Sequence, residues 1–441
     1  MLANPAWFFS SGTTKDSTEV VTTVDHKWTV GDYVLIDQSD TGIGADPPVL
    51  ASSNFLSRAG GHRLQGQIVK ITNVPNPTTA DFTPPLYFTY IAGTTQKSAV
   101  GVKANSVLNG ISLESFAVNN HASDVPWPLD ITHVFDSQFY DLDLDGIPVD
   151  SQSAVMRVLN SANLTIRRCR VHGAEGYETN QGYGIWLRYT TSSNLIEDNS
   201  FSQLTLGVVF EGSSTGNVVA YNYSTENRWE PCNSGDCPNR IGFINHGGAS
   251  MNLLEGNQVS GRWREDITFG TGHYNILLRN RITQDTEVYS SSGKIITIND
   301  QLQTVDIEAG HWYTAFIGNV LGIVGRELSY EANGVGPPLS DSDTPVLYRL
   351  GYNDAFDGDP LGNDSGVAST MVRHGNWDSV NPAVVWDPSI SSRVIPNSFY
   401  LKSKPSFFGS CAWPWNGPDL TPMTQMLPAK ARYDAPLTPS C

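Results

Sequence analysis

The segment Asn194-Leu-Ile-Glu-Asp-Asn199-Ser-Phe recurs along this chain, each time with an asparagine just after a short apolar run. Further copies are Asn217-Val-Val-Ala-Tyr-Asn222-Tyr, Asn252-Leu-Leu-Glu-Gly-Asn257-Gln-Val and Asn275-Ile-Leu-Leu-Arg-Asn280-Arg-Ile, with degenerate copies at Asn163-Leu-Thr-Ile-Arg-Arg-Cys169 and Ala315-Phe-Ile-Gly-Asn319. The shortest spacing between copies is 23 residues, and insertions lengthen it to 31 and 35. A fixed period of this length indicates a repeat architecture.

Each repeat is long enough for three short strands joined by turns. One such coil cannot bury its apolar face alone, so the coils must stack at the strand spacing of ~4.8 Å. Asn199, Asn222, Asn257 and Asn280 then lie one above another. Asparagine tolerates the left-handed turn conformation, and its amide can bond to the next coil. We therefore expect these asparagines to form a structural ladder without a catalytic role.

This stacked asparagine pattern resembles the pectate-lyase-like family of right-handed parallel β-helices, over roughly residues 105 to 400. The resemblance implies an all-β solenoid of three parallel sheets. It also implies a secreted protein that works on carbohydrates, and the segment Ser398-Phe-Tyr-Leu-Lys-Ser-Lys-Pro resembles the tail of secreted bacterial β-helix proteins. Lyases, hydrolases, epimerases and phage tailspikes share this fold, so the resemblance does not choose the reaction. The Asp-rich motifs of polygalacturonases and the Arg-rich motif of pectate lyases are not recognisable here.

The two ends of the chain lack the repeat. Residues 1–105 hold alternating segments, such as Lys27–Ile36 and Gly66–Ile71, that predict a small β subdomain covering the first coil. Residues 106–400 form the predicted right-handed parallel β-helix. Residues 401–441 are rich in proline and aromatic residues, and we expect this tail to cap the last coil.

Composition narrows the range of partners. The net charge is −17, and no Lys/Arg stripe is present, so nucleic acid is not expected as a partner. An acidic chain repels a strongly anionic polymer, which favours a neutral or weakly charged glycan. No apolar run reaches the ~18 residues of a membrane span. No coiled-coil heptad of the kind that would support a trimer is visible, and we expect a monomer.

Five cysteines bear on the compartment. Cys232 and Cys237 bracket a short loop, Cys411 and Cys441 flank the tail, and Cys169 lies in a strand pattern. Two loop pairs predict disulfides and an oxidising compartment, whereas five free thiols would indicate a reducing one. The residues Met1–Pro5 do not resemble a signal peptide, so either the protein is cytosolic or a signal has been removed. Because of the cysteine pairs, we expect a secreted protein whose signal has been removed.

Six segments are predicted as strands of one sheet, the first sheet: Ala154–Arg157, Gly184–Arg188, Gly207–Glu211, Gly242–Asn245, Asp266–Gly270 and Lys294–Asn299. Alternation places Met156, Leu187, Phe210, Ile244, Phe269 and Ile298 inside. One outward row is then Arg157, Arg188, Glu211, Asn245, Gly270 and Asn299, and the second is Val155, Trp186, Val209, Phe243, Thr268 and Thr297. His246, Asp300 and His273 follow at or near the strand ends.

Insertions at Gly173–Tyr183, Glu226–Asn239, Gly261–Glu265 and Gln284–Gly293 are expected to wall this sheet. Their aromatic rings suit the stacking of pyranose rings, although the rings could instead only hold the loops to the helix. The predicted substrate-binding residues are Tyr177, Tyr183, Trp186, Trp229, Trp263, Asn245, Arg157, Asn299 and Asp300.

The predicted catalytic residues are Glu211, Arg188, His246, Asp266 and His273. Arg188 should keep Glu211 ionised, although the two could be only a surface ion pair. Hydrolysis needs two carboxyls, ~5 Å or ~6.5–9.5 Å apart, and Glu211 could pair with Glu178, Glu230 or Asp266. A lyase would instead use cationic groups such as Arg157, with Ca²⁺ held by acidic side chains. No motif specifies a cofactor. We prefer the hydrolase, with the lyase and a non-catalytic glycan-binding or tailspike-like protein as alternatives.

The cysteine assignment predicts a thiol count. Denatured but unreduced protein should contain one free thiol per chain, that of Cys169, because the other four are paired. Titration with a thiol reagent under denaturing conditions measures this number. A count of five would place the protein in a reducing compartment.

Overall fold

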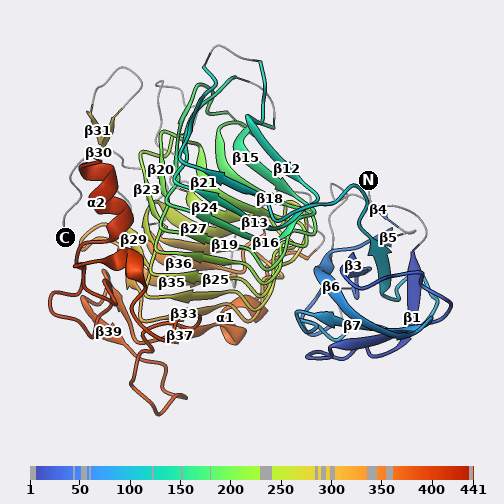
Figure 1. Cartoon of the computed structure of the whole chain (residues 1–441). Coiled ribbons are helices and arrows are strands. Elements are labelled where there is room, and N and C mark those ends of the chain that lie inside the picture. Colours follow the sequence, from blue (N-terminus) through green and yellow to red (C-terminus); the bar gives the residue numbers. More distant parts are fainter. Residues whose placement is uncertain are drawn as a thin grey trace.

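Parallel strands wound into stacked coils make up most of the molecule in the computed structural model (Figure 1). The structure describes residues 6–42, 45–50, 57–58, 61–121, 124–149, 152–178, 180–228, 241–283, 287–289, 295–297, 303–334, 345–353, 361–436 and 441. Each coil contributes one strand to each of three sheets. The fold is the predicted right-handed parallel β-helix.

Sheet 1 runs β12 (Leu129–Thr132), β15 (Ala154–Leu159), β18 (Tyr183–Arg188), β21 (Leu206–Glu211), β24 (Ile241–Asn245), β27 (Arg262–Glu265), β32 (Val305–Ile307), β36 (Val346–Leu350) and β35 (Ser329–Asn333). Sheet 2 runs β10 (Ser112–Glu114), β13 (Val134–Tyr140), β16 (Ala162–Arg167), β19 (Leu195–Glu197), β22 (Val218–Ala220), β25 (Leu253–Glu255), β28 (Ile276–Leu278), β33 (Ala315–Ile317) and β37 (Val372–His374), with β9 (Leu108–Asn109) beside β13.

Sheet 3 runs β11 (Ala117–Asn119), β14 (Asp143–Ile147), β17 (Arg170–Ala174), β20 (Ser200–Ser202), β23 (Tyr223–Thr225), β26 (Gln258–Ser260), β29 (Arg281–Thr283), β34 (Val320–Leu321), β38 (Asn376–Asp378) and β39 (Ala383–Val385). Two small hairpins pair β4 (Ser57–Arg58) with β5 (Gly61–His62), and β30 (Glu287–Tyr289) with β31 (Ile295–Thr297). The described helical segments are α1 (Gly366–Thr370), α2 (Pro428–Asp434) and a 3₁₀ turn at Ser406–Phe408.

The interior is a column of apolar side chains in vertical rows. Ile185, Val208 and Phe243 lie in register on successive strands of sheet 1, and all three are buried in one continuous core. The same parallel register holds in the other two sheets, so identical positions of each repeat meet. The repeat therefore builds one long core that no single coil could form.

The predicted asparagine ladder is confirmed. The Nδ2 of Asn199 donates to the Oδ1 of Asn222 at 3.0 Å, and the same bond continues through Asn257 to Asn280 at 3.0 and 2.9 Å. The predicted backbone conformation of these asparagines is wrong, because the left-handed position belongs to the residue before each of them. That residue has φ between +53° and +60° at Asp198, Tyr221, Gly256 and Arg279.

A second ladder lies at the other corner of sheet 2. It is built by the first asparagine of each motif copy, with Asn194 bonded to Asn217 at 2.9 Å, Asn217 to Asn252 at 3.0 Å and Asn252 to Asn275 at 3.2 Å. These residues were visible in the repeat, but their stacking was not anticipated. Both ends of strands β19, β22, β25 and β28 are thus fixed by buried amides.

The N-terminal subdomain is a closed barrel of β1 (Trp7–Ser11), β2 (Glu19–Thr22), β7 (Thr79–Thr83), β6 (Gln65–Asn76), β3 (Tyr33–Gln38) and β8 (Val100–Lys103). It was expected to cover the first coil, and it lies instead against the side of the helix (Figure 1). The Tyr33 ring stacks on Phe135 at 4.0 Å, and the Tyr87 hydroxyl meets Ser193 Oγ at 2.7 Å. Small residues at this corner, such as Gly216, allow the barrel to approach.

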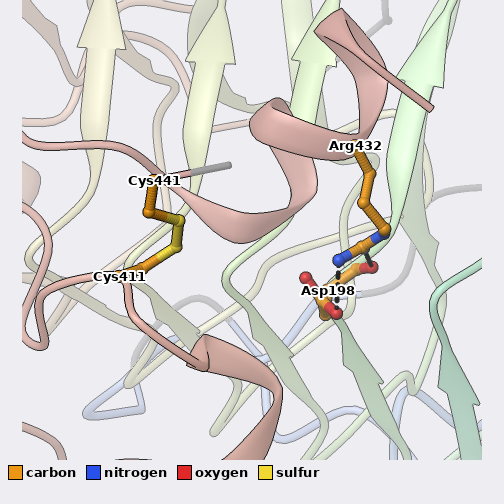
Figure 2. Close-up of a disulfide and its surroundings, with 4 residues drawn as sticks. All are labelled: Asp198, Cys411, Arg432 and Cys441. Atoms are coloured by element: carbon orange, nitrogen blue, oxygen red, sulfur yellow. Dashed lines mark hydrogen bonds and ion pairs between the residues drawn. A yellow bond between two sulfur atoms is a disulfide. The ribbon is translucent and has the colours of Figure 1, made fainter. Parts of the chain in front are cut away.

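The C-terminal tail also packs on a side and not over the last coil. Arg279 donates to the Asp419 carboxylate at 2.7 Å, and Trp415 Nε1 donates to the Gly256 carbonyl at 2.6 Å. Further along, Arg432 of α2 reaches Asp198 at 2.9 Å, beside the Cys411–Cys441 disulfide (Figure 2). The tail runs across several coils because the residues before the ladder asparagines present their side chains along that corner.

The disulfide prediction is confirmed for the three cysteines that the structure describes. Cys411 and Cys441 are bonded, and Cys169 is a free, buried thiol. Cys232 and Cys237 lie outside the described residues. Among the described residues, none of the helices is long and apolar enough to cross a membrane.

The ladder predicts a large effect for Asn257→Ala. This change removes the acceptor of the Asn222 amides and the donor to the Val219 carbonyl, all of them buried. Buried polar groups left unpaired cost about 1–3 kcal/mol each, so the free energy of unfolding should fall by at least about 3 kcal/mol. Chemical denaturation measures it.

Asn73→Ala is the matched control, because the Asn73 amide is exposed and bonds only Asp81 among its described contacts. Asn73→Ala should change the free energy of unfolding by no more than about 0.5 kcal/mol. Equal effects of the two changes would contradict a structural role for the ladder.

Candidate functional site

Sheet 1 differs from its predicted form in its later strands. Gly261–Glu265, predicted as a loop, forms β27 after a turn at Gly261 with φ of +134°. The next strand of the sheet is β32, whereas the predicted strand Lys294–Asn299 contributes β31 to a separate antiparallel hairpin. The predicted strand Asp266–Gly270 is a turn that follows β27.

These changes move several predicted residues to the inside. Asn245 is in register with Phe210 and Glu265 and points inward, where its Nδ2 donates to the Ala249 carbonyl at 3.0 Å. Trp263 is in register with Phe243 and Val305 in the core. Tyr177 is also part of that core. The predicted outward positions of these three side chains are wrong.

Other predicted residues lie apart from one another. Arg157 pairs with Asp130 at 2.6 Å and stacks over Trp127 at 3.4 Å, and it is in register with Trp186 and not with Arg188. His273 is buried, and burial together with the nearby charge of His311 lowers its pKa to about 3. Trp229, Asn299 and Asp300 lie outside the described residues.

Four of the five predicted catalytic residues do come together. They stand at the ends of successive sheet 1 strands, and Glu308 follows them on the next coil. Arg188 is in register with Glu211, the His246 amide bonds the Phe210 carbonyl, and the Asp266 amide bonds the Asn245 carbonyl. We call Arg188, Glu211, His246, Asp266 and Glu308 the charged row.

Glu211 is the buried acid of this row. Its Oε1 accepts from Arg188 Nε at 2.6 Å, and its Oε2 accepts from Trp186 Nε1 at 2.7 Å. Only 1% of the residue is exposed. Burial raises the pKa of Glu211, and this effect exceeds the opposing charge of Arg188. The expectation that Arg188 dominates the ionisation of this carboxyl is therefore wrong.

His246 and Asp266 form the second pair. His246 Nδ1 lies 2.8 Å from Asp266 Oδ2, and the Thr268 amide donates to Oδ1. Burial opposes a charge on His246, but the charge of Asp266 and their hydrogen bond outweigh it and raise the pKa of His246. The pKa of Asp266 is lowered despite its burial, chiefly by His246 and then by Arg264.

Two further charged residues were missed in the sequence. Arg264 lies 3.8 Å from Asp266 and 2.5 Å from Glu308, so it joins the row to the next coil. Glu308 ends the segment Val305-Asp-Ile-Glu308, whose alternation of apolar and acidic residues would have marked it as a strand. Arg262-Trp-Arg-Glu265 holds a single apolar residue and gives no such signal.

Tyr183 and Trp186 line the approach to the row. Their rings meet edge to face at 5.4 Å, and Tyr183 lies 6.4 Å from the His246 ring. Both are almost fully buried, so in this state they support the charged side chains and present no open ring face.

The charged row offers acid–base chemistry. Glu211 is driven toward its protonated form, whereas Asp266 is held ionised two coils away, about 9.6 Å at the usual strand spacing. Two carboxyls with separated pKa values are the pattern of an acid and a base in one site. Within the residues that the structure describes, no group of three or more His, Cys, Asp or Glu side chains is arranged to hold a metal ion.

Comparisons with known proteins agree with the fold. Residues 153–310 match the family described as the right-handed β-helix region, so the chain contains such a region. A search of curated proteins found no match.

Solved structures similar to this chain include tailspikes and a glycoside hydrolase. The tailspike of Pseudomonas phage LKA1 has 13% identity and a TM-score of 0.42, over 73% of this chain and 46% of its own. The tailspike of Acinetobacter baumannii bacteriophage AP22, solved with a capsular saccharide, has 14% identity and a TM-score of 0.40, over 86% and 57%. A glycoside hydrolase has 10% identity and a TM-score of 0.28, over 83% and 79%. This chain spans about half the length of the two tailspike chains.

The His246–Asp266 pair predicts a titration change. Asp266→Asn removes the charge that raises the pKa of His246, so burial should then dominate and that pKa should fall. NMR titration of the imidazole signals measures it. His121 is the control, because it pairs with Asp145 and Glu175 on another edge and should keep its raised pKa. An unchanged pKa of His246 in Asp266→Asn would contradict the proposed interaction between His246 and Asp266.

The same pair predicts how stability depends on pH. The folded pKa of His246 lies above its unfolded value, so its stabilisation is complete below about pH 6.5 and is lost as the pH rises through the folded pKa. In Asp266→Asn the free energy of unfolding should therefore fall less between neutral and alkaline pH than in the parent chain. Chemical denaturation at several pH values measures this difference.

Proposed function

We propose that this chain is a glycoside hydrolase in which Glu211 acts as the general acid and Asp266 as the general base. The observation that carries the proposal is their position on one row with pKa values shifted in opposite directions. A separation of about 9.6 Å is just above the ~6.5–9.5 Å typical of inverting enzymes, where a water molecule fits between base and sugar, and far above the ~5 Å of retaining enzymes. We therefore expect inversion.

The other members of the row have supporting roles in this proposal. His246 orients Asp266 and lies between the two acids. Arg188 and Arg264 side chains are 12% exposed, more than the two acids, so a glycan would meet these cations first. They can donate hydrogen bonds to hydroxyls. The Cys411–Cys441 disulfide supports an oxidising compartment outside the cytosol, where polysaccharides occur.

A second candidate is a polysaccharide lyase. The favouring observation is the same pair of arginines with His246, since lyase chemistry must neutralise a uronate carboxylate. Against it, the charge of Asp266 and the hydrogen bond to it raise the pKa of His246 despite burial, which favours the protonated imidazole, a form that cannot accept a proton. A panel of neutral and uronate polysaccharides, read for new reducing ends and for absorbance of unsaturated uronates, separates the two reactions.

Glu211→Gln tests the hydrolase directly. This change keeps the size of the side chain and removes the acid. Release of reducing ends should fall by at least the ~10²-fold typical of a lost general acid or base. Asp266→Asn should have a similar effect.

Glu197→Gln is the matched control. Glu197 is also buried and is held by Arg167 and by Tyr400, but it lies on sheet 2 under the tail. Removing the Glu197 carboxylate should lower the melting temperature and leave the release of reducing ends unchanged. Full activity in Glu211→Gln would refute its role, and binding of glycans without turnover by the parent chain would favour the non-catalytic alternative.

A further inference from the structure

Two adjoining cavities lie beside sheet 2, away from the charged row; barrel residues line the first of them, and sheet 2 with its turns lines the second. One has a volume of about 370 Å³ and the other about 320 Å³, and both are lined by Asp136 and Asn163. Each falls within the usual size range of small-ligand sites. The walls come from the barrel, from the first coils of sheet 2 and from the turns beside them, with no residue of sheet 1. We call them together the junction groove.

Asp136 stands between the two cavities with a built set of partners. It accepts from Tyr33 Oη at 2.5 Å, Lys70 Nζ at 2.6 Å and Asn163 Nδ2 at 2.6 Å. Burial acts to raise the pKa of Asp136, but these donors outweigh it and lower that pKa. A carboxylate has about four acceptor positions, so one remains for a ligand hydroxyl.

Lys70 supplies donors on the same wall. Its ammonium has three N–H groups, and 40% of the side chain is exposed. Because Asp136 balances its charge, the wall presents a donor and an acceptor side by side and little net charge. Pro84, which is partly exposed, adds apolar surface next to them.

The second cavity is lined by hydroxyls and an amide. Gln138 Nε2 donates to Ser112 Oγ at 2.8 Å and to Glu114 Oε1 at 2.7 Å, which turns its carbonyl oxygen away from these partners. Thr165 lines the same cavity from the next strand. Paired donors and acceptors beside small apolar patches match the hydroxyls and C–H faces of a sugar.

We propose that the junction groove is a second saccharide-binding site, which takes a neutral oligosaccharide and is separate from the charged row. A neutral ligand is favoured over a uronate because Glu114 borders the groove, the Lys70 charge is already balanced, and the whole chain carries a net charge of −17. A ligand bound here would contact both the barrel and the helix.

Neutral oligosaccharides on an array, followed by calorimetry with maltotriose, cellotriose, xylotriose and mannotriose, test this with the full chain. Lys70→Met removes the donors, and Thr165→Tyr fills the second cavity from the surface. Each should weaken binding at least about tenfold. Lys103→Met is the matched control, since Lys103 is a barrel lysine of similar exposure paired with Asp32 at 2.7 Å, and it should bind as the parent does.

The outcomes separate this proposal from the hydrolase. Glu211→Gln should keep groove binding, because that residue lies on another sheet. Binding that is unchanged in both groove variants, or no saturable binding of any neutral oligosaccharide, would overturn the groove and leave the hydrolase untouched. Binding lost only in Glu211→Gln would place the sugar at the charged row.

Discussion

The buried hydrogen bonds between stacked asparagines are the constraint on which the rest of this structure depends. In the ladder of Asn199, Asn222, Asn257 and Asn280, each amide links to the next coil and also bonds a backbone group. In a dry interior such groups are costly to leave unpaired, so each coil is held in one register. A slip would break a whole set of bonds at once.

That register also decides where the two ends of the chain can dock. The left-handed residue before each ladder asparagine projects from the corner of the coil, and these residues form two outer rows along sheet 2. The tail packs on one row, through Asp198, Tyr221 and Arg279. The barrel packs on the other, through Ser193 and Gly216. Both terminal units therefore sit beside the solenoid, and strands β10 and β11 of the first coil stay largely exposed.

The charged row follows from the same stacking. Residues in register on successive coils lie about 4.8 Å apart, a distance at which like charges repel. Its signs alternate instead, from Arg188 to Glu211, His246 and Asp266, with Arg264 between Asp266 and Glu308. Both acids are buried, but burial outweighs the charge of Arg188 at Glu211, whereas His246 and Arg264 outweigh burial at Asp266, which separates the proton affinities of the two acids. The fold thus provides an arrangement suited to proton transfer.

The repeat was readable in the sequence because it is periodic and local. The asparagine spacing predicted the parallel coils and the ladder, and the short Gly-led strands placed Arg188 beside Glu211. Register beyond an insertion was not readable, because nothing in a loop says which residue begins the next strand. A shift of one residue exchanges the inner and outer faces, and for this reason Asn245 was placed outside. Trp263, Arg264 and Glu308 were misplaced or overlooked because the strands β27 and β32, which hold or precede them, were not recognised. Where the barrel and the tail lie, and how burial offsets the charge of Arg188 on Glu211, depend on contacts between residues far apart in the chain, and these exist only once the coils are stacked.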